Sequence, residues 1–481
     1  MDKLLQRMAW SATVAFLVVA AWAQVVRAED EQKQPDEYYA LMKVLVDTFE
    51  QIDRNYVKDV DRRELVEAAV RGMLAELDPY SDYISPDDLT KFTEAVEQEF
   101  GGVGIQVQWN PDDRSIMVMT PFPGSPAYKA GVRAGDKIVE IEGEQVKDFP
   151  TGEEISTAVG LLKGPPGVEV TVGVRHLDSE EVETVKMTRD VIRLDTVMGD
   201  QHKADGSWNF ILDGESKIGY LRITHFTKRT ASELQTALRQ LRDQGMKGLV
   251  LDLRFNPGGL LQAAVEVCDL FIENGMIVST EGRNVKPQKW TAKPLSTFKD
   301  FPMAVLVNRY SASASEIVSA CLQDHHRAVV VGERTWGKGS VQNVVELEGG
   351  HSALKLTTAA YHRPSGKNIH RFPNAEESDE WGVMPDTEFL IEFTPKELSE
   401  YHSYRQKRDL PPESVPERPE FDDRQLAKAL EYISEQLTKD QQTVEKPAGE
   451  AADNPPAPAE KSKDAAALPI QFLRIPRTFH G

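Results

Sequence analysis

The segment MAVLVNRYSASASEI, residues 303–317, decides the fold of this chain. Its first five residues are all apolar, as in a strand that is buried on both faces, and the residues from Ser313 onward suit a helix. Polar and small residues join the two parts. A buried strand that leads directly into a helix is typical of an α/β layer with a largely parallel sheet.

The same alternation recurs on both sides of this segment. We expect strands at 218–223, 248–253, 303–307 and 328–331, helices at 231–244, 260–272 and 313–322, and further strands at 353–361 and 386–393. This part of the chain is therefore expected to form an α/β core with a mixed, largely parallel sheet.

Residues 100–190 show a different pattern, in which Gly and Pro separate short apolar runs. The runs predict strands at 103–109, 116–119, 137–141, 168–174 and 182–187, with short helices at 125–130 and 152–162. Five short strands and two helices in about ninety residues predict a small, partly open barrel.

The ends of the chain are helical or of low complexity. Helices are expected at 37–56, 61–77, from Ser85 onward and at 423–439, and the first has an apolar stripe that we expect to be buried: Leu41, Val44, Leu45, Thr48, Phe49 and Ile52. Residues 444–467 are rich in Pro, Ala, Glu and Lys and predict a disordered tail. The expected divisions are 1–28, 29–99, 100–190, 191–395, 396–440 and 441–481, an α+β multidomain chain.

Length and charge limit the classes of function that this chain can have. The chain has 481 residues and a formal net charge of −21, which argues against a nucleic acid as the main partner. Lys3 and Arg7 precede an apolar run to Val26, and Ala28 suits signal cleavage, although the run is also long enough to stay as a membrane anchor. We therefore expect an exported, periplasmic protein.

The two cysteines, Cys268 and Cys321, fall in apolar helical patterns and are expected in the core.

Three glycine-rich or small-residue turns follow predicted strands. The turn at 308–316 opens a helix, where free N–H groups and an exposed side chain suit a serine nucleophile, but the residues alone leave Ser311, Ser313 and Ser315 open. The turn at 332–342 places Lys338 between two glycines, so a desolvated lysine with a lowered pKa can serve as a base. A phosphate-loop interpretation fails because Gly339 stands where Ser or Thr is needed. The turn ending in Gly258 and Gly259 can supply N–H groups to an oxyanion hole together with Ala314.

A fourth glycine-rich segment opens the small barrel. Several N–H groups of this segment can bind a peptide carboxylate, while the peptide adds as a strand beside Ile105. The segment consists of Gly101, Gly102, Val103, Gly104 and Ile105. With the later Gly and Pro turns, this order is typical of a PDZ domain.

These segments together resemble the carboxyl-terminal processing, or tail-specific, protease family over roughly residues 37–440. The small-residue box at 311–316, the Gly-Lys-Gly box at 337–342 and a PDZ domain that precedes both match the family, as do 78–83 and 363–366. Trp336 departs from the Phe or Tyr that is usual there. The resemblance implies Ser313 as nucleophile, Lys338 as base and Gln342 as the amide that orients the lysine.

The implied activity is that of a serine endopeptidase without metal or other cofactor. It would bind the apolar C-terminal tail of a protein at the PDZ domain and cleave through an acyl-enzyme. Two alternatives stay open: a Ser-His-Asp protease that uses His225, His325 or His326, and a catalytically silent PDZ adaptor or scaffold. A homo-oligomer or an adaptor protein as partner is compatible with the sequence.

Overall fold

The computed structural model describes residues 37–445, except for 178, 204, 213, 296 and 412–419 and the side chains of 440–445. The expected signal or anchor at 1–28 and the expected tail from 446 lie outside the described residues. Within the described residues, no helix is both long and apolar enough to cross a membrane.

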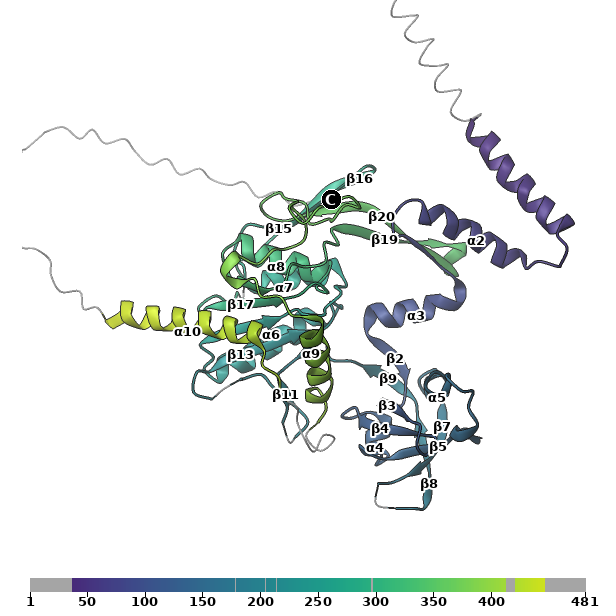
Figure 1. Ribbon diagram of the computed structural model, residues 1–481, viewed down its shortest axis with the longest axis horizontal. Coiled ribbons are helices and arrows are strands. Elements are labelled where there is room, and N and C mark those ends of the chain that lie inside the picture. Colours follow the sequence, from purple (N-terminus) through teal and green to yellow (C-terminus); the bar gives the residue numbers. More distant parts are fainter. Residues whose placement is uncertain are drawn as a thin grey trace, which may run out of the picture. The chain divides into compact units, whose positions relative to one another are not determined.

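A five-stranded sheet forms the centre of the α/β core (Figure 1). Its order is β10 (Val197–Met198), β13 (Ile218–Ile223), β14 (Gly248–Asp252), β17 (Met303–Val307) and β18 (Val329–Gly332). The last four strands are parallel and β10 is antiparallel to β13. The expected mixed, largely parallel sheet is confirmed.

Helices cover both faces of this sheet, because alternate residues of each strand point to opposite faces. Leu249 and Leu251 of β14 belong to a core shared with α6 (Thr230–Asp243), α7 (Leu261–Asp269) and α8 (Ala314–Asp324). Val250, between them, packs with Ala429 and Ile433 of α10 (Arg424–Glu445) on the other face. The core is thus a three-layer arrangement.

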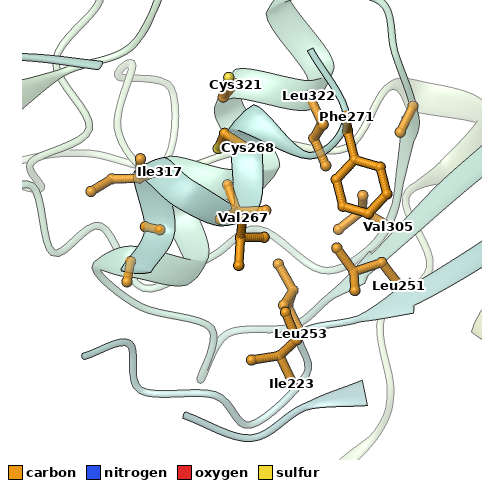
Figure 2. Close-up of a cluster of buried hydrophobic side chains, with 14 of the residues drawn as sticks. Ile223, Leu251, Leu253, Val267, Cys268, Phe271, Val305, Ile317, Cys321 and Leu322 are labelled. Atoms are coloured by element: carbon orange, nitrogen blue, oxygen red, sulfur yellow. The ribbon is translucent and has the colours of Figure 1, made fainter. Parts of the chain in front are cut away.

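The interface of α7 and α8 holds both cysteines. Figure 2 shows Cys268 and Cys321 next to each other on the two helices, with Leu251 and Val305 of the sheet nearby. Both thiols are free and fully buried. Burial raises the pKa of Cys268, and the hydrogen bond with Cys321 adds to this. The expectation that both cysteines lie in the core is confirmed.

A second, antiparallel sheet stands beside the first. It contains β1 (Asp82–Ile84), β20 (Ser352–His362), β15 (Met276–Gly282) and β16 (Val285–Thr291) in that order, and β19 (Ser340–Leu347) also pairs with β20. Of these strands the sequence predicted only β20. β16 is mostly polar and exposed, and β19 is half polar without a regular apolar alternation. The buried strand β15 was not predicted either.

The prediction of a strand at 386–393 is wrong. The segment contains a short 3-10 helix, Thr387–Phe389, and a single bridge from Leu390 to Gly332. Its apolar pattern arises because Phe389 and Phe393 are buried anchors, while Leu390 is 40% exposed.

The small domain has the expected strands and helices. Its sheet follows the order β3 (Ile105–Asn110), β4 (Ser115–Pro121), β5 (Lys137–Ile141), β7 (Glu169–Arg175) and β8 (Val182–Thr188), with β6 (Glu144–Gln145) beside β5 and with α4 (Pro126–Lys129) and α5 (Glu154–Leu162). Next to it, β2 (Glu99–Gly102) pairs with β9 (Asp190–Arg193). Because β3 pairs only with β4 in the described sheet, its other edge is open to an added strand.

The segments at the two ends of the described residues are helical, as expected. A helix over 37–55 precedes α2 (Arg62–Ala75) and α3 (Pro86–Glu97), and α9 (Pro395–Arg408) precedes α10. The expected burial of the first helix's stripe is wrong, since Leu41, Val44 and Leu45 are 62%, 63% and 43% exposed. A helical period therefore marks an apolar face, but not whether the same chain covers it. A small hairpin, β11 (Gln201–His202) and β12 (Trp208–Asn209), completes the elements.

Candidate active site

Ser313 is the residue that precedes the first turn of α8. Its backbone has φ 55° and ψ −112°, an unfavourable conformation for a residue with a side chain. Such a conformation costs on the order of 1–3 kcal/mol and occurs often at functional sites. The tight turn between β17 and α8 imposes it and leaves Ser313 8% exposed.

The hydroxyl groups of the three serines in this turn have different surroundings. Ser311 Oγ donates to Leu253 O at 2.8 Å and accepts from Asn308 N at 2.9 Å. Ser315 Oγ donates to Asn256 O at 2.9 Å, and both residues are fully buried. Within the described residues Ser313 Oγ donates its proton to no acceptor, although Ser313 and Glu316 form a capping box at the start of α8. Of the three hydroxyls, that of Ser313 is the one available for chemistry.

Glu316, one turn into α8, is a fully buried carboxylate that joins two segments of the site. One oxygen accepts from Ser313 N at 2.7 Å and Lys338 N at 2.8 Å. The other accepts from Thr335 Oγ1 at 2.7 Å and Gly337 N at 2.6 Å. Burial raises the pKa of Glu316 to about 7, against the lowering effect of these four donors.

Lys338 lies between β18 and β19 in a turn that needs both of its neighbouring glycines. A Cβ on Gly339 would lie 2.2 Å from His370 N, and one on Gly337 would lie 2.7 Å from Arg371 Cβ. The close approach of residues 370–371 half-buries Lys338. Burial lowers the pKa of its ammonium, and the nearby charge of Lys355 lowers it further, whereas Glu316 opposes the shift.

The structure brings Ser313 and Lys338 to the same carboxylate, but not into direct contact by hydrogen bond. Among the residues that the structure describes, Lys338 Nζ has no hydrogen-bond acceptor, neither Ser313 nor Gln342. Gln342 Nε2 instead donates to Ser340 Oγ at 2.8 Å and to Thr357 Oγ1 at 3.3 Å. Catalytic hydrogen bonds are often long in ligand-free enzymes and shorten when substrate binds.

The glycine turn after β14 lies against Ser313. A Cβ on Gly258 would lie 2.8 Å from both Ser313 Cβ and Ala312 O, and its φ is +105°. However, Gly258 N already donates to Asn256 Oδ1 at 2.8 Å. Ala314 N and Gly259 N have no such acceptor among the described residues, so these two amides suit an oxyanion better than Gly258 does.

The small domain has a groove of about 80 Å³ at its open edge. Its lining residues are Phe100, Gly102, Val103, Gly104, Ile105, Val107, Val159, Leu162 and Lys163. They include all of the predicted peptide-binding residues except Gly101, whose Cα faces Gly164 O. Lys163 Nζ lies 4.5 Å from the centre of the Phe100 ring at the groove.

Comparison with known proteins places these features in a family. The model "Activating protease CtpB N-terminal domain" matches residues 8–88, the PDZ domain model 117–176, and the model for peptidase family S41 217–389. A carboxy-terminal-processing protease of Bartonella bacilliformis is 37% identical over 369 residues, which cover 76% of this chain and 77% of the relative. The chain belongs to the carboxyl-terminal processing proteases of peptidase family S41.

The chain is also similar to a second relative and to a solved structure. A carboxyl-terminal-processing protease of Picosynechococcus is 36% identical over 71% of this chain and 76% of its own length. The structure of the photosystem II D1 C-terminal processing protease is 30% identical and covers 73% of this chain and 93% of that one, with a TM-score of 0.40. The family models and the two relatives make the chain a serine-type peptidase with a PDZ domain.

Sequence reasoning missed three residues of this S41 site. Glu316 was part of the small-residue box without a role, although Ser at a helix start and Glu three residues later is a capping pattern. Asn256, fully buried, holds Gly258 N and accepts from Ala312 N. Tyr80, from the N-terminal region, places its ring 5.2 Å from Lys338 Nζ, and no local pattern predicts that contact.

The three histidines that were considered as alternative bases do not contact Ser313 through a hydrogen bond in the described residues. His325 Nε2 bonds with Met276 O at 2.7 Å, and burial lowers the pKa of His225. In the described part of the chain no hydrogen bond joins His225, His325 or His326 to Ser313. No group of His, Cys, Asp and Glu within that part is arranged to hold a metal ion.

Proposed function

We propose that this protein is an exported endopeptidase that captures the C-terminal tail of a protein substrate at its PDZ groove and cleaves the chain with Ser313 and Lys338. The observation that carries the proposal is the difference between the three serines. Ser311 and Ser315 give their hydroxyl protons to backbone carbonyls, whereas Ser313 Oγ has no acceptor within the described residues. A nucleophile needs a free hydroxyl, so this geometry favours Ser313.

Lys338 is the proposed general base. A lysine can accept a proton near neutral pH only if its pKa is lowered, and burial and the charge of Lys355 both act in that direction. Neutral Lys338 removes the proton of Ser313 as Oγ attacks the peptide carbonyl. In this proposal Ala314 N and Gly259 N stabilise the oxyanion, and water then hydrolyses the acyl-enzyme.

Tail capture is proposed for the groove beside β3. A peptide can add as a strand to the open edge of β3, with an apolar side chain against Val159 and Leu162. The N–H groups of Val103 and Gly104, which have no acceptor among the described residues, are available for its carboxylate. The export proposal rests on the charge and apolar pattern of residues 1–28.

Cleavage of a peptide with an apolar C-terminus, followed by mass spectrometry, tests the nucleophile. We expect Ser313→Ala to reduce the cleavage rate by about 10³-fold or more, while Ser311→Ala and Ser315→Ala keep measurable turnover. Thermal unfolding of each variant controls for folding. Cleavage by Ser313→Ala at the parent rate would exclude the proposed nucleophile, and no cleavage by the parent protein with any tail peptide would favour a silent PDZ adaptor.

The pH dependence of kcat/KM tests the base. Because the pKa of Lys338 is lowered, the rate should rise with pH well below the ~10.4 of free lysine. The charge-preserving variant Lys338→Arg should lose activity across the range, since an arginine stays protonated. A rise only near pH 10 would contradict a buried, neutral lysine.

A further inference from the structure

The turn between α2 and α3 reaches the lysine of the active site from a remote part of the sequence. Asp78 holds this turn together, since its carboxylate accepts from Tyr80 N at 2.7 Å, Ser81 N at 2.8 Å and Ser81 Oγ at 2.9 Å. Directly after it, β1 pairs antiparallel with β20. The turn is therefore a fixed part of the antiparallel sheet.

Tyr80 presents its ring to the side chain of Lys338. Nζ lies 5.2 Å from the ring centre, within the range of a cation–π interaction. Trp336 Nε1 donates to the Tyr80 hydroxyl at 3.3 Å, and His370 contacts the ring edge-on at 6.2 Å between ring centres. Since Lys338 Nζ has no hydrogen-bond acceptor within the described residues, the ring is a principal contact of the ammonium.

Ser81, the next residue, connects the same turn to Gln342. Ser81 Oγ accepts from Thr357 N at 3.1 Å and lies 3.4 Å from Thr357 Oγ1. Thr357 Oγ1 in turn accepts from Gln342 Nε2 at 3.3 Å. One turn of five residues thus touches both the ammonium of Lys338 and the partner of the Gln342 amide.

We propose that the turn of residues 78–82 is a positioning element of the catalytic site, in which Tyr80 holds the ammonium of Lys338 and Ser81 orients Gln342 through Thr357. This inference rests on the proposed role of Lys338 as base. Tyr80 is a positioning residue, because it contacts the base and not the substrate. The N-terminal helical region is thereby part of the protease site, although it lies more than two hundred residues from Ser313 in the chain.

The proposal predicts a direction for the pKa of Lys338. A ring face stabilises the protonated ammonium, so Tyr80 opposes the lowering effect of burial, and its removal should lower the pKa further. The other charged groups near the ammonium are Glu316 of α8 and Lys355 of β20. His370 lies against the Tyr80 ring, and burial lowers the pKa of His370 while the charge of Asp78 opposes this shift.

The test is the pH profile of kcat/KM for tail-peptide cleavage by the full-length protein. Tyr80→Leu removes the ring and should shift the acid limb to lower pH by about half a unit, and lower the plateau about 10-fold, because the lysine is less well held. Tyr80→Phe keeps the ring face and should leave the limb within about 0.2 unit of the parent. His370→Gln should leave the limb in place if the limb belongs to Lys338.

A series of phenylalanines at position 80 with increasing ring fluorination separates the charge effect from shape. Fluorination weakens the negative face of the ring with little change in size, so the limb should move stepwise to lower pH. This series keeps the test decisive if Tyr80→Leu fails to fold. An unmoved limb across the series, or equal effects of Tyr80→Leu and Tyr80→Phe, would overturn the role of Tyr80.

The contact from Ser81 through Thr357 to Gln342 is tested by a separate measurement. Thr357→Val removes one of the two acceptors of the Gln342 amide, the one that links it to Ser81, and should lower kcat about 10-fold with little change in KM, whereas Thr358→Val, a matched change at the next residue, should not. Equal effects of Thr357→Val and Thr358→Val would overturn the proposal that Ser81 orients Gln342 through Thr357. Failure of the dyad itself is distinguishable, because Ser313→Ala would then cleave at the parent rate whatever the Tyr80 and Thr357 variants do.

Discussion

Glu316 and Asp252 are both fully buried carboxylates in the same α/β core, yet their surroundings differ in kind. Asp252 meets the guanidinium of Arg254 at 2.7 Å and the hydroxyl of Tyr220 at 2.7 Å, and Arg254 also pairs with Asp423 at 2.9 Å. Glu316 accepts hydrogen bonds from neutral groups alone, three backbone amides and the hydroxyl of Thr335.

The difference in partners separates the two pKa values. Burial alone would raise the pKa of Asp252, but the charge of Arg254 and the hydrogen bonds from Arg254 and Tyr220 together outweigh it and hold the pKa below its ordinary value. For Glu316 burial prevails, and its pKa rises to about 7. A buried carboxylate paired with a cation joins elements of the fold. A buried carboxylate that accepts only from neutral donors, such as Glu316 beside Ser313 and Lys338, keeps a pKa near neutral pH.

The largest expected effect is on the ion pair. Arg254→Met leaves Asp252 and Asp423 without their cation and should lower the free energy of unfolding by about 3–5 kcal/mol. Urea denaturation at pH 7 measures it. The double variant Asp252→Asn with Arg254→Met removes the buried charge as well and should recover a large part of the loss. A loss below about 1 kcal/mol would show that the pair is not structural.

The next largest expected effect is that the contributions of Glu316 and Asp252 to stability depend on pH in opposite directions. Glu316 has a folded pKa of about 7 against 4.5 for the free group, so its contribution is present below pH 4.5 and is lost as the pH rises through 7. The stability difference between parent and Glu316→Gln should therefore fall by about 3 kcal/mol from pH 4.5 to pH 8.

Asp252 should behave in the opposite way. Its pKa is lowered, so its contribution is present above the unfolded value and is lost as the pH falls through the folded value. The stability difference between parent and Asp252→Asn should therefore shrink on acidification below pH 4. Slopes of the same sign in Glu316→Gln and Asp252→Asn would remove the distinction between the two sites.

The smallest effect compares the loss of one hydroxyl at each carboxylate. Thr335→Val and Tyr220→Phe should each cost about 1–2 kcal/mol of unfolding free energy, because each removes a buried hydrogen bond. Only Thr335→Val should also lower kcat/KM at pH 7, by about 10-fold, because it raises the pKa of Glu316 and loosens the Lys338 turn. Equal activities in the two variants would mean that Glu316, too, is only structural.

Local patterns predicted much of this molecule. The parallel strands and their helices followed from runs of apolar residues, and the glycines beside Lys338 correctly indicated a close backbone approach. The first helix, 37–55, was found by the same period, but its apolar face is exposed, because a period reports a face and not its partner. The strands β16 and β19 were not predicted, although each pairs with the adjacent strand in the chain, because neither shows a regular alternation of apolar and polar residues.

For the site, sequence alone determined the types of residue: a serine turn at a helix start, a lysine between glycines, and a glycine turn that can face them. Only the tertiary structure decided which hydroxyl is free and which groups share a carboxylate. Ser311 and Ser315 are engaged by carbonyls of the neighbouring β14 turn, and Glu316 and Tyr80 meet Lys338 through segments far apart in the chain. Hydrogen bonds and desolvation act over a few ångströms in space, so the order of residues along the chain does not contain them directly.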